Sequence, residues 1–123
     1  MPFIHDTALD ALLADIDDNA EELHICTAEP AVYADIATYS KGQKTSLLIT
    51  APADRGGGGR ELVVPAITDG AVDGDGTVTH WAIVKVTATS RLLAAGLLSS
   101  GQAVTNGNTF TLTEFTIGVP DAV

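Results

Sequence analysis

A ten-residue stretch with apolar side chains on both of its faces does most to limit the folds open to this chain. Residues 77–86 read Thr-Val-Thr-His-Trp-Ala-Ile-Val-Lys-Val, with Thr79, Trp81 and Ile83 on one face and Val78, His80, Ala82 and the following valines on the other. A strand that is apolar on both faces is usually covered on both. The stretch therefore predicts a central strand of a sheet.

Several shorter strands surround this one and are separated by Gly, Asp and Asn turns. Residues 68–70 predict a turn, and Asp-Gly-Asp-Gly at 73–76 predicts a hairpin that leads into the central strand. In the last strand, 109–119, the apolar residues change parity, which predicts a bulge near Thr113 and Glu114. We therefore expect a mostly β fold, a β-sandwich or small barrel of about seven to eight antiparallel strands.

One amphipathic helix precedes the strands. Leu9, Leu12, Leu13 and Ile16 recur at the spacing of a single helical face, which predicts a helix at about residues 7–18. The β-rich body then covers about residues 22–119. A chain of 123 residues is the usual size of one domain, so we expect a single domain over residues 1–123.

The charge of the chain limits its partners. Sixteen acidic residues against six basic ones give a net charge of −10. Binding to nucleic acids or to anionic membranes depends on Lys and Arg, so we expect neither. The apolar runs are too short to span a bilayer, and the N-terminus lacks the basic and apolar regions of a signal peptide. We expect synthesis and assembly in a cytoplasm.

No pattern in the sequence predicts an enzyme or a bound cofactor. The segment 41–46 resembles a phosphate-binding loop but has Gln43 where that motif needs glycine before the lysine. His5, His24 and His80 are scattered singly, without an adjacent acid and nucleophile. Cys26 is the only cysteine and lies in an apolar stretch, so we expect a buried thiol.

Three aspartates, Asp69, Asp73 and Asp75, lie among glycines and could collect a calcium ion. They lack the alternating ligands and the closing glutamate of a calcium-binding loop. Turn formation explains the segment more simply, so we predict no metal site, with calcium as the alternative.

Two segments are the best candidates for contact with a partner. The first is the apolar N-terminal segment, and the second is a glycine run between two arginines, which could become ordered on assembly. The candidate contact residues are Pro2, Phe3, Ile4, Arg55, Gly56, Gly57, Gly58, Gly59 and Arg60.

The C-terminal half contains, in order, a Trp-containing strand at 77–84, a Leu-rich strand at 90–100 that includes Gly96-Leu97-Leu98, and Val104-x-x-Gly-x-x-Phe110. This order resembles the β-sandwich modules of small virion proteins of tailed bacteriophages. The opening helix followed by Leu-His-Ile-Cys-x-x-Glu-Pro at 23–30 is similar to virion proteins from phages of alphaproteobacteria. The resemblance carries no catalytic residues, which agrees with a protein that is not an enzyme.

The resemblance implies a structural role on a virion. The leading hypothesis is a head-decoration or cement protein that binds the major capsid protein on the capsid exterior, as a homo-oligomer such as a trimer, and stabilises the shell. The alternative is a tail, baseplate or fibre component involved in host adsorption. A weaker alternative is a small carbohydrate- or ligand-binding β-sandwich, which Trp81 exposed beside polar side chains would favour and a buried Trp81 would not.

Overall fold

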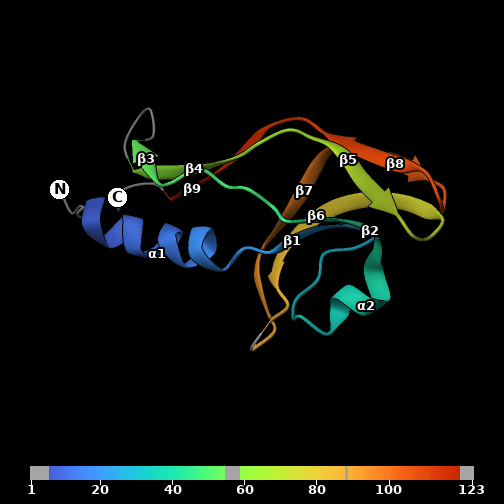
Figure 1. Cartoon of the computed structure of the whole chain (residues 1–123), viewed down its shortest axis with the longest axis horizontal. Helices are drawn as coiled ribbons and strands as arrows, with labels where there is room; N and C mark the ends of the chain where they lie inside the picture. The colour runs from blue at the N-terminus through green and yellow to red at the C-terminus, as the bar shows by residue number, and fades with distance from the viewer. Residues whose placement is uncertain (1–5, 55–58, 88, 120–123) are drawn as a thin grey trace.

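The computed structural model of the chain describes residues 6–54, 59–87 and 89–119 (Figure 1). Within them the helices and strands follow in this order: α1 (Asp6–Asn19), β1 (Glu22–Cys26), α2 (Asp35–Tyr39), β2 (Ser40–Thr45), β3 (Ala53–Asp54), β4 (Arg60–Val64), β5 (Ile67–Val72), β6 (Gly76–Lys85), β7 (Arg91–Val104), β8 (Thr109–Leu112) and β9 (Phe115–Val119). The expected mostly β fold with a helix at its front is confirmed. The helix extends one residue beyond the predicted range 7–18 at each end.

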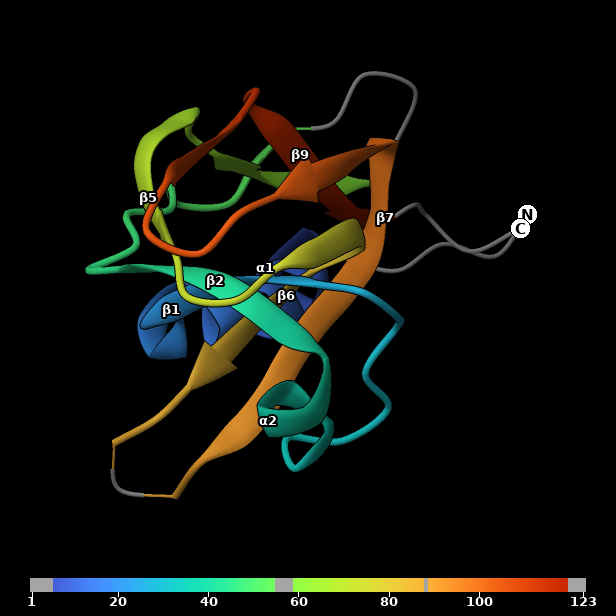
Figure 2. The same cartoon turned by 90° about the vertical axis from the view of Figure 1, so that its right-hand side faces the viewer.

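Six strands form an antiparallel sheet that curls into a half-barrel, in the order β7-β6-β1-β2-β5-β8 (Figure 2). Four strands, β6, β1, β2 and β5, are paired on both sides, and we call the first three of them the closed wall. At its centre, Ile25 of β1 lies between Trp81 of β6 and Gly42 of β2. We call the gap between the two edge strands, β7 and β8, the open seam, since nothing pairs across it in the described part of the chain.

The other three strands form a small sheet in the order β3-β4-β9, and α1 packs against β4 (Figure 1). Leu9 and Leu13 of the helix and Leu62 of β4 are fully buried, so the apolar helix face predicted from the sequence is the face that packs. An ion pair adds to this contact, with Arg60 Nε of β4 donating to Asp10 Oδ1 at 2.7 Å.

Apolar side chains form one cluster on each face of the half-barrel. The larger cluster fills the inside and includes Leu23, Ile25 and Ile83, whereas the smaller lies outside, where α2 covers Cys26 and Val84. The central position of β6 is therefore confirmed.

The predicted division of β6 into two faces holds only over part of the strand. Val78 packs inside with Ile83, although the alternation placed it outside with Ala82 and Val84. The register of β6 and β7 shifts between Val78 and His80, and such an irregularity reverses the parity of the residues before it.

Two predicted turns differ in the structure. Residues 68–70 lie within β5, where Asp69 pairs with Lys44 of β2 at 3.0 Å and the ring of Phe110 lies against Gly70. Residues 73–76 do connect β5 to β6, but the two strands do not pair as a hairpin. The neighbours of β5 are β2 and β8, while those of β6 are β1 and β7, so the connection crosses the half-barrel.

At Thr113 and Glu114, where a bulge was predicted, the chain passes from one sheet to the other. The chain leaves the six-stranded sheet after Leu112 and enters the small sheet at Phe115, where it pairs with Val64 of β4. The change in parity along 109–119 therefore reflects a strand that switches sheets, not one extra residue in a continuous strand.

Candidate functional site

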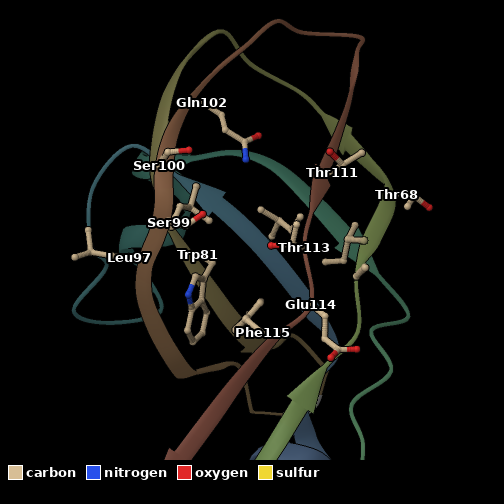
Figure 3. A pocket seen from close by; sticks show the side chains of 14 residues that line it. Thr68, Trp81, Leu97, Ser99, Ser100, Gln102, Thr111, Thr113, Glu114 and Phe115 are labelled. Atoms are coloured by element: carbon tan, nitrogen blue, oxygen red, sulfur yellow. The ribbon is translucent and has the colours of Figure 1, made fainter.

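The open seam contains a groove with a volume of about 740 Å³. One side of the groove is formed by β7, the other by the end of β8 and the start of β9, and Trp81 of β6 lies in its floor (Figure 3). A groove of this size falls in the usual range of small-molecule sites, roughly 300–1,000 Å³. The groove is the candidate functional site.

Trp81 occupies its position because its neighbour in β7 has no side chain. Trp81 is paired with Gly96, and a Cβ atom placed on that glycine would lie 2.8 Å from Cζ2 of the indole. Phe115 of β9 packs on the indole, with ring centroids 4.7 Å apart and planes inclined by 39°. The half-buried indole is therefore fixed by a glycine and a second aromatic ring.

The strand β7 carries a wide irregularity beside the groove. Leu97 pairs with His80 and Gln102 pairs with Val78, so residues 98–101 of β7 lie opposite Thr79 alone. In a regular strand alternate side chains leave the groove, but here Ser99 and Ser100, which are consecutive, both line it. The irregular backbone thus places more polar side chains on this wall than a regular strand could.

The opposite wall is irregular for a different reason. Thr111, Leu112, Thr113, Glu114 and Phe115 all line the groove, because the chain leaves β8 and enters β9 within this stretch. Figure 3 shows Thr113 across the hollow from Ser99 and Ser100, and Gln102 directed into the hollow from β7. Both walls therefore present hydroxyl or amide groups above a half-buried apolar floor.

The groove holds little charge. Glu114 is the one acidic residue among its lining residues, and none of them is Lys, Arg or His. The indole N–H of Trp81 has no hydrogen-bond partner among the described residues, and it is not a buried unsatisfied group. The N–H is therefore accessible to solvent as a donor, on the side of the indole that faces β7 (Figure 3).

A second cluster joins three residues that the sequence treated separately. His24 Nδ1 lies 2.8 Å from Ser40 Oγ, and His24 Nε2 lies 3.0 Å from Glu22 Oε1. The prediction that His24 has no acid and hydroxyl beside it is therefore wrong. Glu22 and His24 could have been matched as alternate residues of one strand, but the contact with Ser40 depends on the register of β1 and β2.

The contacts of this cluster are those of a link between strands. His24 is 7% exposed, and Ser40 Oγ also donates to the carbonyl oxygen of Gly42 at 3.2 Å. None of the three residues lines the groove. We interpret the cluster as a polar connection between β1 and β2 on the outer face of the closed wall.

The other candidate residues lie elsewhere. Pro2, Phe3, Ile4, Arg55, Gly56, Gly57 and Gly58 fall outside the described residues. Gly59 is buried with a φ of 92°, and Arg60 is half-buried in its ion pair with Asp10. Neither Gly59 nor Arg60 lines the groove.

The three aspartates considered for calcium do not converge. Asp69 pairs with Lys44, and Asp75 Oδ1 accepts a hydrogen bond from the backbone N–H of Asn106 at 2.7 Å. Over residues 6–54, 59–87 and 89–119, no three His, Cys, Asp or Glu side chains gather as metal ligands would.

Cys26 is buried under α2, as the sequence predicted. Burial raises the pKa of its thiol to about 11, so the thiolate that would act as nucleophile is scarce near neutral pH. Neither helix in the described ranges is long and apolar enough to cross a membrane.

No protein-family model, curated protein or solved structure matches the chain. The features that point to a function are therefore the groove, the charge of the chain and the resemblance in its strand pattern.

Proposed function

We propose that the chain is a structural protein of a bacteriophage virion that works by binding, with decoration of the capsid exterior as its main role. The observation that carries the proposal is the open half-barrel, whose two edge strands leave a groove of about 740 Å³ without a covering element in the described part of the chain. A sheet that stops short of closing leaves groups exposed that a second partner, other than the capsid protein, can bind.

The positions of the predicted contact residues and of the groove support this role. Of the predicted contact residues that the structure describes, Arg60 begins β4, which pairs with β3 and packs against α1 at one end of the molecule (Figure 1). The groove lies away from that end, between β7 and β8. A module attached to the capsid protein through the first end would leave its groove facing outward.

The charge of the chain also suits an exterior position. With a net charge of −10, copies repel one another in solution and remain soluble until they bind specific sites. An acidic chain also has no attraction for the packaged DNA, which favours the outside of the shell over the inside.

The position of the protein in purified particles tests the proposal. We expect mass spectrometry to detect the chain in DNA-filled heads of the phage that encodes it, and cryo-electron microscopy to place it on the capsid exterior in symmetric oligomers. Its absence from DNA-filled heads would contradict the proposal.

A second candidate function is host adsorption by a tail, baseplate or fibre component. The half-buried Trp81 beside polar side chains favours it, because such a groove can bind molecules on a cell surface. An exposed Trp81 would favour the weaker alternative, a ligand-binding β-sandwich, and the half-buried indole meets that condition in part. Gold-labelled antibody on tails rather than heads would select the adsorption role, and absence from every particle would select the ligand-binding one.

A further inference from the structure

The chemistry of the groove defines a class of ligand independently of where the protein sits. Its walls offer side-chain groups that donate and accept hydrogen bonds, from Ser99, Ser100, Gln102, Thr111 and Thr113. Hydroxyl groups do both, and the amide of Gln102 supplies donors and an acceptor at fixed positions. A ligand that matches these walls carries many hydroxyl or amide groups of its own.

The charge of the groove excludes anionic ligands. Phosphate, sulfate and carboxylate groups are bound by Arg, Lys or clustered backbone N–H groups, and no lining residue is basic. Glu114 would repel such a group and can accept hydrogen bonds from a neutral one. The ligand is therefore not an anion, and the hydroxyl and amide groups of the walls favour a neutral one.

The floor of the groove adds an aromatic surface and one more donor. The indole of Trp81 is seated against Gly96 and Phe115, and its N–H has no partner among the described residues. An amphipathic aromatic ring packs on the apolar face of a sugar ring while its N–H bonds a hydroxyl group. Because the indole is already held in place, it needs little reorganisation when a ligand binds.

We infer that the groove between β7 and β8 binds a neutral oligosaccharide, with one sugar ring against Trp81 and its hydroxyl groups hydrogen-bonded to Gln102 and the serines of β7. The inference goes beyond the proposed structural role, since it holds for a decoration protein and for an adsorption protein alike. Its tests use the isolated chain, so they succeed or fail independently of the location of the protein in particles.

An added β-strand is the competing occupant of a gap between two edge strands. Strand addition needs a regular row of free N–H and C=O groups, and residues 98–101 interrupt that row in β7. Irregular edges of this kind are a common protection against strand addition. The same irregularity brings Ser99 and Ser100 to the groove together, which serves a small polar ligand.

Trp81 provides the readout, because it is the only tryptophan in the chain. Its emission would be followed while neutral oligosaccharides of glucose, galactose or N-acetylglucosamine, about four to six units long, are added up to about 10 mM. We expect at least one of the three to produce a saturable change. An oligouronate and an extended Val-Thr peptide, titrated in parallel, should produce none.

Single substitutions then place the binding site. Replacing Gln102 by Ala (Q102A) should weaken the affinity about threefold to tenfold, as expected for one lost hydrogen bond. Thr38→Ala is the matched control, because Thr38 is exposed on α2, and it should leave the affinity unchanged. Trp81→Phe, followed by calorimetry, should weaken binding more than Q102A if the indole is the platform.

Three outcomes would overturn the inference. The first is no saturable change with any of the three neutral series. The second is saturation by the peptide or the oligouronate instead. The third is a sugar affinity that Q102A and Thr38→Ala lower equally.

Discussion

The closed wall and the open seam belong to the same sheet but differ in how completely they are covered. In the wall, Leu23 and Ile25 are buried inside the half-barrel and Cys26 is buried outside it under α2. At the seam, Leu97 is 73% exposed and the polar walls of the groove face solvent. The wall is therefore covered by the protein itself, whereas the seam leaves apolar and polar groups exposed to solvent.

The largest expected difference between the two regions comes from removing the same side chain in each. Leu23→Ala in the wall should lower the free energy of unfolding by about 2–5 kcal/mol, because it leaves a cavity in a packed core. Leu97→Ala at the seam should change it by less than about 0.5 kcal/mol. Urea denaturation of both variants measures the difference, and equal losses would contradict the comparison.

A methyl group added to a glycine should give a smaller difference of the same kind. A Cβ on Gly42 in the wall would lie 2.6 Å from the carbonyl oxygen of Ala71, a backbone atom that cannot easily move. We expect Gly42→Ala to cost about 1–3 kcal/mol, as overpacking usually does.

Gly101 at the seam is the matched control for Gly42. Its nearest neighbours to an added Cβ are 3.6 Å away, which is ordinary contact. Gly101→Ala should therefore change the free energy of unfolding by less than about 0.5 kcal/mol. If the two alanine variants unfold at the same urea concentration, the wall is less tightly packed than its distances indicate.

The smallest expected effect concerns the exposed polar contacts beside the wall. The pKa of Glu21 is lowered by hydrogen bonds from Thr87 and from the backbone N–H of Val86, and the pKa of Asp15 is lowered by its hydrogen bonds from Arg91. A lowered pKa contributes stability that is complete above the ordinary values of 4.5 and 3.8 and is lost as the pH falls through the lowered values. Acidification below about pH 4.5 should therefore lower the melting temperature.

Replacing Glu21 by Gln checks the sign of this dependence. Glutamine does not titrate, so Glu21→Gln should lose less stability between pH 6 and pH 3 than the unmodified chain. Thr87→Val removes one donor and keeps the carboxyl group, so its profile should lie between the two. A steeper acid loss in Glu21→Gln than in the unmodified chain would show that the sign is wrong.

The sequence predicted those parts of the fold that depend on local pattern. The spacing of Leu9, Leu13 and their neighbours gave α1 within one residue at each end, and the doubly apolar stretch 77–86 gave the interior strand β6. Both signals arise from residues that are close in the chain.

The sequence did not predict the features that depend on the order of the strands in the sheet. Asp-Gly-Asp-Gly at 73–76 favours a tight connection, but β1 and β2 occupy the positions that a hairpin would need. The groove was not predicted for the same reason, since its walls come from β7, β8 and β9, which meet only through the curl of the sheet. From the sequence alone, it could be said only that an exposed Trp81 would favour a ligand-binding function and that a buried Trp81 would not.

Hydrogen exchange of the backbone amides, read by mass spectrometry or NMR, tests most directly that the wall is structural and the seam is the binding surface. In the free protein, amides of β1 and β6 should exchange slowest, and those of residues 98–101 should exchange fast. With a saturating neutral oligosaccharide, new protection should be confined to β7, β8 and the start of β9. Uniform exchange over the six strands, or new protection centred on β1 and β2, would contradict the account.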